Sequence, residues 1–133
     1  MNEREQCGGM METPAQTTIL VVDDSEIFLQ AVTAYFTKRG IRVYTSRSVS
    51  EACLLVGRNP GIDIMFLDFH LNGINDGTEL LKKLKKYSMN HIRIFACSAS
   101  DSENRKLLEY GCDGVTGKDL AGIKQVVFGG NGR

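Results

Sequence analysis

Short apolar segments alternate with segments of helical spacing along nearly the whole chain, and this alternation restricts the fold more than any other feature. The apolar segments cover residues 18–23, 41–45, 62–68 and 92–98, with a brief fifth within 113–118. The first and third are continuous apolar runs, which are typical of strands covered on both faces. Strands that alternate with helices predict one parallel sheet with helices on both faces. We therefore expect an α/β fold, a doubly wound (βα)5 domain with a five-stranded parallel sheet.

N-terminal capping signals support three of the expected helices. Ser25 is suited to cap the helix that follows the first strand, because a serine hydroxyl accepts from free backbone N–H groups of the first turn. Ser48 with Glu51, and Ser100 with Glu103, have the spacing of a capping box. In that motif the glutamate side chain also reaches back to the backbone of the cap. These patterns predict the starts of the second and fourth helices.

The expected helix ends and faces follow from glycines and apolar spacing. Gly40, Gly57 and Gly111 are suited to end the first, second and fourth helices. The third helix is expected to end at about Tyr87, and its run KKLKKY is typical of a solvated face, not of a nucleic-acid site. In the first helix, these apolar residues have helical spacing and are expected to face the core: Ile27, Phe28, Ala31, Val32, Tyr35 and Phe36.

The composition is that of a single soluble domain. The chain has 133 residues, enough for one core, and its 16 basic and 16 acidic residues cancel, so we expect neither nucleic acid nor membrane as a partner. No apolar run approaches the roughly 20 residues that span a bilayer, and the N-terminus lacks the apolar stretch of a signal peptide. We expect a cytoplasmic protein with a flexible arm at 1–16, one domain at 17–128 and a flexible tail at 129–133.

Polar residues stand at the ends of the predicted strands. Asp23 and Asp24 follow the first strand, Asp68 the third, Ser98 the fourth and Lys118 the fifth. In a doubly wound sheet, the ligand site lies beyond the carboxyl ends of the strands. Adjacent carboxylates at the rim of a core repel each other and resist desolvation, so they need a cation, a basic side chain or water. We expect these five side chains to meet in one cleft.

Three carboxylates in one cleft favour a hard cation, and oxygen ligation with open positions suits Mg²⁺. Together with Lys118 the metal would bring the cluster close to neutrality. A phosphoryl group that entered the cleft would meet two sources of positive charge, which is how phosphoryl transfer is assisted. Asp68 is then placed to attack phosphorus and become an aspartyl phosphate, and the Ser98 hydroxyl to bond to a phosphoryl oxygen.

The motifs VVDDSE, IMFLDFHLNGINDG, CSAS and GVTGKDL occur in an order and spacing that resemble the receiver domain of two-component response regulators. The resemblance covers about residues 17–128 and implies a flavodoxin-like (CheY-like) fold. It implies that Asp68 is the phosphoacceptor, charged by a phosphohistidine on a sensor histidine kinase or a histidine phosphotransfer protein. It further implies a metal site of Asp23, Asp24, Asp68 and the backbone carbonyl of His70.

By the same resemblance, Ser98 is the switch hydroxyl and Lys118 the lysine that senses the phosphoryl group. The phosphorylated domain would then bind a downstream protein target or pair with itself. Such a domain is a signalling relay and not a turnover enzyme.

The chain departs from the family pattern at three positions. Asp119 stands where a proline, joined through a cis bond, usually follows the lysine, so the bond here is either strained or trans. Val115 stands where an aromatic residue often swings inward on activation, which changes the expected hydroxyl–aromatic switch. Asn72 replaces a common proline in the loop after the acceptor, and this loop is expected to be one residue longer.

Two other functions use the same residues. A degenerate receiver that binds a protein constitutively agrees with Asp119 and Val115 and predicts no phosphorylation. A metal-dependent phosphohydrolase would share the acid cluster, but it needs a second carboxylate two residues after its nucleophile, where His70 stands. The His70 imidazole itself is either a guide for water at the cleft or a solvated loop residue.

Overall fold

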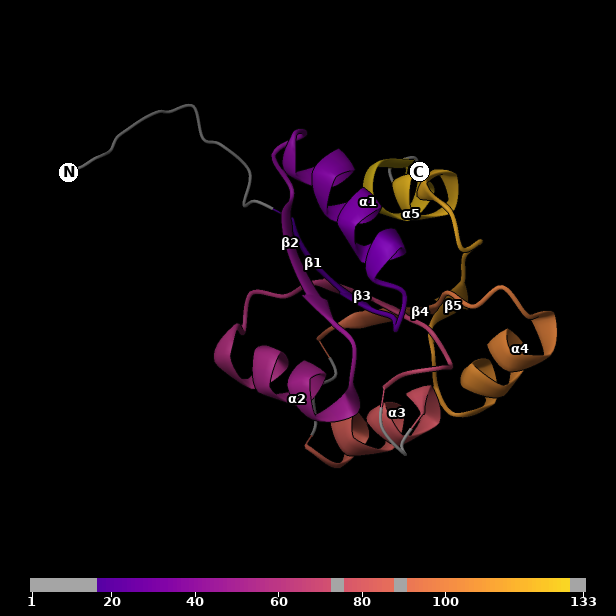
Figure 1. Cartoon of the computed structure of the whole chain (residues 1–133). Coiled ribbons are helices and arrows are strands. Elements are labelled where there is room, and N and C mark those ends of the chain that lie inside the picture. Colours follow the sequence, from indigo (N-terminus) through magenta and orange to yellow (C-terminus); the bar gives the residue numbers. More distant parts are fainter. Residues whose placement is uncertain (1–16, 73–75, 88–90, 130–133) are drawn as a thin grey trace.

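The computed structural model describes residues 17–72, 76–87 and 91–129, which form one parallel sheet with helices on both faces (Figure 1). The predicted arm at 1–16, most of the tail and residues 73–75 of the acceptor loop lie outside the described residues. The strands are β1 (Thr18–Val22), β2 (Arg42–Ser46), β3 (Ile64–Leu67), β4 (Arg93–Ala96) and β5 (Gly114–Val115). Their order is β2-β1-β3-β4-β5, and every pair is parallel. The predicted α/β fold is confirmed.

The helices divide between the two faces of the sheet. They are α1 (Glu26–Thr37), α2 (Val49–Arg58), α3 (Gly77–Lys86), α4 (Asp101–Glu109) and α5 (Leu120–Phe128). Helices α1 and α5 cover one face, while α2, α3 and α4 cover the other (Figure 1). The chain moves outward from β1 to β2, returns to β3 and continues to the opposite edge. This reversal places a crevice at the carboxyl ends of β1 and β3.

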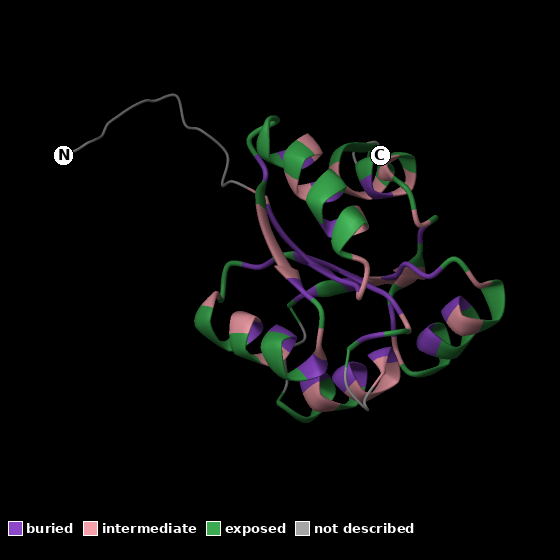
Figure 2. Ribbon diagram, in the orientation of Figure 1, coloured by how far each residue is buried: buried purple, intermediate pink, exposed green. Residues whose placement is uncertain are grey.

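The core lies on both sides of the two central strands. Every residue of β1 and β3 is buried, as expected for strands covered on both faces (Figure 2). Successive residues point to opposite faces, so Leu20 packs in the cluster with α2, α3 and α4, while Ile19 packs in the cluster with α1 and α5. The central strands are therefore held from both sides, and their carboxyl ends are held with them.

The predicted N-caps are present. The Ser25 hydroxyl accepts from the Phe28 N–H at 3.3 Å. The Ser48 hydroxyl accepts from the Glu51 N–H at 3.2 Å. At α4, a serine hydroxyl again accepts from the N–H three residues later. The hydroxyl half of both predicted capping boxes is thus confirmed; the glutamate half differs between them and is described below.

Two predictions about helix faces and ends are wrong. Ile27 is 82% exposed and Ala31 is also exposed, because the buried face of α1 runs through Leu29 and the residues that follow it at helical spacing. Gly57 lies inside α2 and does not end it. The helix stops after Arg58, where the Asn59 backbone N–H and side-chain amide both donate to the Leu55 carbonyl.

Three of the four cysteines lie in the described part of the chain. Cys97 and Cys112 are buried and Cys53 is half-buried, all three as free thiols; Cys7 lies outside the described residues. In α3, Leu81 and Leu84 are buried among mostly exposed lysines, as a solvated helix face requires. Within the part of the chain that the structure describes, no helix has both the length and the apolar character needed to cross a bilayer.

Candidate functional site

The strand register brings the predicted polar residues to one edge of the sheet. The Asp23 N–H donates to the Ser46 carbonyl of β2 at 3.0 Å, and the Asp68 N–H donates to the Val22 carbonyl of β1 at 2.9 Å. On the other side of β3, the Cys97 N–H donates to the Leu67 carbonyl at 2.8 Å. These bonds extend the parallel ladder by one residue past each strand, so Asp23 and Asp68 lie on adjacent strand ends.

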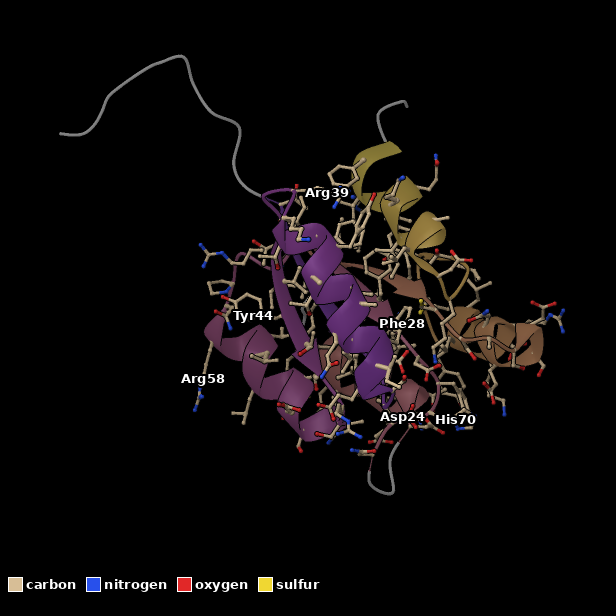
Figure 3. The ribbon with its side chains drawn as sticks, turned by 45° about the horizontal axis from the view of Figure 1, so that its top comes forward. Asp24, Phe28, Arg39, Tyr44, Arg58 and His70 are labelled. Carbon is tan, nitrogen blue, oxygen red and sulfur yellow. The ribbon has the colours of Figure 1, made fainter. Side chains whose placement is uncertain are left out.

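Three carboxylates form a compact cluster at this edge. One oxygen each of Asp23, Asp24 and Asp68 lies within 4.8 Å of the others. Asp23 and Asp68 are only 1% and 3% exposed, while Asp24 is half-buried. Asp24 and His70 point toward the same end of the molecule in Figure 3, away from Arg39 and Arg58. The sequence prediction that these carboxylates meet agrees with this geometry.

Burial raises the pKa of both buried carboxyls, and a neighbouring carboxylate adds to each rise. Desolvation raises the pKa of Asp68 to about 6, the Asp23 charge adds to the rise, and Lys118 opposes it. Desolvation also raises the pKa of Asp23, although the Ser25 N–H, at 2.9 Å from Asp23 Oδ1, opposes the shift. The charged form of each of these two carboxyls therefore carries a desolvation cost, a condition found at functional sites.

Lys118 supplies positive charge to this pair. Its Nζ lies 3.1 Å from Asp23 Oδ2 and 3.4 Å from Asp68 Oδ2, and 5.6 Å from the ring centre of Phe28. Burial alone would lower the pKa of Lys118, but its attraction to the two carboxylates raises it. Lys118 is therefore charged and bridges the acidic pair.

The residue after Lys118 does not prevent this contact. No peptide bond among the described residues is cis, so the Lys118–Asp119 bond is trans. Asp119 instead caps α5: its carboxylate accepts from the Gly122 N–H at 2.7 Å. Of the two alternatives left by the sequence, the trans loop is the one observed, and Lys118 still reaches Asp68.

Ser98 is buried at the end of β4, but its hydroxyl does not donate to the carboxylate cluster. Its Oγ donates to Glu103 Oε1 at 2.7 Å and accepts from the Ser100 N–H at 3.2 Å. Its backbone is held on both sides by Asn104, whose side chain accepts from the Ser98 N–H at 2.8 Å and donates to the Ser98 carbonyl at 2.9 Å. Ser98 is therefore rigidly placed with its proton directed to Glu103.

Glu103 is the residue that the sequence analysis missed. The capping-box prediction sends its carboxylate back to the backbone at Ser100. The structure instead shows it bonded to the Ser98 hydroxyl through one oxygen and to His70 Nε2, at 2.6 Å, through the other. The Ser98 hydroxyl and the His70 ring hold the pKa of Glu103 below its usual value. The exposed His70 ring is thus paired, while the role of its backbone carbonyl stays a prediction.

The carboxylate cluster has the character of a cation site. Asp23 Oδ2 is buried and, among the described residues, receives no hydrogen bond of acceptable geometry, although Lys118 lies close to it. A buried anionic oxygen in this condition is costly unless a charged partner compensates it. Oxygen ligands from three carboxylates, with one ammonium for balance, suit a hard divalent cation such as Mg²⁺. The residues present therefore fit a Mg²⁺ site.

Comparison with known proteins identifies the family. Residues 19–125 match the family model of the response regulator receiver domain. The chain belongs to this family. Among curated proteins, the response regulator SaeR of Staphylococcus aureus is 32% identical to this receiver over 74 residues, which cover 56% of the chain and 31% of SaeR. The receiver thus matches less than a third of the length of that relative.

Solved structures agree with the fold. The CheX–CheY–BeF₃–Mg complex of Borrelia burgdorferi contains a chain 26% identical to this receiver, with a TM-score of 0.72 over 86% of this chain and 89% of that one. The receiver domain of Saccharomyces cerevisiae Ssk1, solved with the histidine phosphotransfer protein Ypd1, is 20% identical, with a TM-score of 0.73 over 84% of this chain and 86% of that one. The second likeness shows the fold alone.

One departure of this receiver from the family pattern has a structural counterpart. Val115, at the position where an aromatic side chain was expected from the family, lies on the edge strand β5 and is 46% exposed. A valine side chain has no ring to move into the space beside Ser98. The hydrogen bonds of Ser98 among the described residues are made with Ser100, Glu103 and Asn104.

Proposed function

We propose that this receiver accepts a phosphoryl group on Asp68 from a phosphohistidine and uses Mg²⁺ held by Asp23, Asp24 and Asp68. The observation that carries the proposal is the buried Asp23–Asp68 pair with Lys118 at 3.1 Å and 3.4 Å from its two carboxylates. Three carboxylates and one ammonium leave a deficit of positive charge, which a divalent cation balances. A site built for structure alone has little reason to retain such a cluster.

The transfer step uses groups whose positions are known. An Asp68 carboxylate oxygen forms a bond to phosphorus as the P–N bond of the donor phosphoimidazole breaks, and the electron pair of that bond stays on the ring nitrogen. Lys118 Nζ, already beside Asp68, lies where negative charge accumulates on the phosphoryl oxygens. Bound Mg²⁺ supplies further positive charge to the same oxygens. The Ser98 hydroxyl then donates to a phosphoryl oxygen.

The donor in this proposal is a sensor histidine kinase or a histidine phosphotransfer protein in the cytoplasm. The complex of Ssk1 with Ypd1 is an example of a receiver fold bound to a phosphotransfer protein. On this chain, Ile27 projects from the first turn of α1, directly after the Asp23–Asp24 pair, and is 82% exposed. We propose this exposed apolar side chain as one contact for a docked donor. The output is binding of a downstream protein or of a second copy of the domain.

Intact mass after incubation with acetyl phosphate and Mg²⁺ tests the proposal. We expect the wild-type chain to gain one phosphoryl group and Asp68→Asn to gain none. Asp101→Asn removes an exposed carboxylate at the start of α4 and should gain the group as the wild type does. Addition of EDTA before the donor should prevent the gain. A folded wild-type chain that gains nothing from acetyl phosphate or from a phosphohistidine protein would overturn the proposal.

A second candidate function is constitutive protein binding. The exposed Val115 favours it, because a receiver without the aromatic switch side chain lacks one known means of reporting phosphorylation. In that case the chain would bind its partner equally well with and without phosphorylation, and Asp68→Asn would bind as the wild type does.

A further inference from the structure

Glu103 connects two parts of the site that are far apart in the sequence. Through Oε1 it accepts from the Ser98 hydroxyl at 2.7 Å, and through Oε2 it contacts His70 Nε2 at 2.6 Å. Ser98 lies two residues after β4, and His70 lies in the loop two residues after Asp68. Glu103 itself belongs to the first turn of α4. One carboxylate therefore ties α4 both to the Ser98 hydroxyl and to the acceptor loop.

The Ser98 hydroxyl cannot serve Glu103 and a phosphoryl group at the same time. A hydroxyl has one proton to donate, and here that proton goes to Glu103. The Ser98 oxygen is also held by the Ser100 N–H at 3.2 Å, and its backbone is held by Asn104. A phosphoryl oxygen at Asp68 that accepts a bond from Ser98 would therefore take this proton away from Glu103.

Charge repulsion between a phosphoryl group and Glu103 would also favour loss of the Ser98–Glu103 bond. A phosphoryl group adds roughly two negative charges near neutral pH, and Glu103 is itself a carboxylate whose charge the Ser98 hydroxyl and the His70 ring stabilise. Like charges in a partly buried site repel each other. Phosphorylation of Asp68 would thus remove the hydrogen bond that holds Glu103 and would also repel its side chain.

We propose that Glu103 is a positioning residue that holds the unphosphorylated state: it binds the Ser98 hydroxyl and the His70 ring, and it loses the bond from Ser98 when a phosphoryl group on Asp68 takes the Ser98 proton. The inference rests on the proposed phosphorylation of Asp68 and adds the residue with which the phosphoryl group competes. Because Glu103 favours the unphosphorylated state, its removal should favour the phosphorylated one. A residue shifts the balance between the unphosphorylated and phosphorylated states only if its contacts differ between them, as those of Glu103 would.

The chain contains a matched control for this inference. Residues 46–51, SRSVSE, repeat the serine–glutamate pattern of residues 98–103, SASDSE. Glu51 also accepts from a serine hydroxyl at a strand end, at 3.4 Å, and from the Arg47 N–H at 3.2 Å. Glu51 contacts no residue of the acceptor loop in the described chain. Its truncation therefore removes the same kind of side chain without the proposed competition.

The test measures binding of beryllofluoride, a tetrahedral mimic of a phosphoryl group, with Mg²⁺ and the full chain. We expect Glu103→Ala to bind it about tenfold more tightly than the wild type, because a hydrogen bond to a charged group no longer competes for Ser98. Glu103→Gln should fall between them, and Glu51→Ala should stay within about twofold of the wild type. Loss of structure alone would weaken binding, so the direction of the change separates positioning from damage.

A double-mutant cycle completes the test. In a Ser98→Ala background, Glu103→Ala should no longer change beryllofluoride affinity, because the contested proton is absent. Equal or weaker binding by Glu103→Ala, with a wild type that binds normally, would overturn the role of Glu103 and leave the proposed function intact. A folded wild type that binds no beryllofluoride would overturn both. A gain that persists without Ser98 would also overturn the competition proposed here.

Discussion

Two segments of this receiver have the same pattern of serines and a glutamate but different contacts. Residues 46–51 (SRSVSE) follow β2 and lead into α2, and residues 98–103 (SASDSE) follow β4 and lead into α4. Because the strand order is β2-β1-β3-β4-β5, they flank the central strands that carry Asp23 and Asp68. The acid pair thus has a similar hydroxyl-rich turn on either side.

In the first segment, the side-chain hydrogen bonds of Ser46 and Glu51 stay within the segment. The Ser46 hydroxyl donates to the Ser48 carbonyl at 2.9 Å, and Glu51 accepts from the Arg47 N–H at 3.2 Å. The Arg47 side chain then reaches across to the Asp24 carbonyl at 3.2 Å. This segment therefore behaves as a helix cap that also supports the edge of the acid cluster.

The second segment directs its glutamate away from the helix backbone. The Ser98 hydroxyl donates to Glu103, while His70 approaches Glu103 from the loop after β3. A second donor from another element is thus within reach of Glu103, and no such donor reaches Glu51 among the described residues. The glutamate of a capping motif thus leaves the helix backbone when a neighbouring loop brings another partner within hydrogen-bonding distance.

Truncation of the two strand-end serines should show the largest difference between the segments. We expect Ser98→Ala to weaken beryllofluoride binding roughly tenfold or more, because a hydrogen bond to a charged group is lost. Ser46→Ala should leave that affinity within about twofold and lower the free energy of unfolding by about 1 kcal/mol, since its hydroxyl makes only local bonds. Titration of both variants with beryllofluoride and urea measures the two effects. Equal losses of affinity would remove the functional distinction between the segments.

The acid cluster between the segments should bind Mg²⁺ in a pH-dependent way. The pKa of Asp68 is raised to about 6, so a proton competes with the metal below that pH and affinity falls as pH falls. From pH 7 to pH 5 we expect the apparent affinity to drop about tenfold. Calorimetric titration at both pH values measures it. Asp101→Asn should keep the dependence, and Asp68→Asn should bind weakly with much less change; a wild-type affinity independent of pH would contradict the assignment.

The two N-caps should be nearly equivalent, which is the smallest predicted effect. The Ser48 and Ser100 hydroxyls each accept from the N–H three residues later, at 3.2 Å and 3.4 Å. We expect Ser48→Ala and Ser100→Ala each to lower the free energy of unfolding by about 1 kcal/mol. Urea denaturation followed by circular dichroism compares them. A much larger loss for Ser100→Ala would mean that the second segment depends on its cap in a way that the first does not.

Local sequence accounts for the helix caps and the strands, but it does not determine which apolar residues of α1 face the core. The predicted hydroxyl caps at Ser25, Ser48 and Ser100 are all present, because each acts on its own first helical turn. The apolar spacing of α1 also predicted a buried face, yet Ile27 is exposed and Leu29 is buried. Both fit a helical spacing, and only packing against the sheet distinguishes them.

The site shows the same division. The meeting of Asp23, Asp24, Asp68 and Lys118 was predictable, because parallel strands place their carboxyl ends at one edge. The contact between Lys118 and Asp68 in the absence of a following proline was not predictable. It depends on the trans loop that Asp119 fixes by capping α5. The sequence offered both outcomes and no means to choose.

By itself, then, the sequence determined the alternation of strands and helices, the acidic cluster and the family, because apolar periodicity and motif order are properties of neighbouring residues. The partner of the Glu103 carboxylate, in contrast, depends on how the strands pack in the sheet. Its partner His70 lies 33 residues away along the chain, and the contact exists because the β3 and β4 ends are adjacent in the sheet. The Glu103 carboxylate could accept from its own helix backbone or from another element, and it bonds to the donors that the fold brings within hydrogen-bonding distance. The spacing of residues along the chain does not predict that distance.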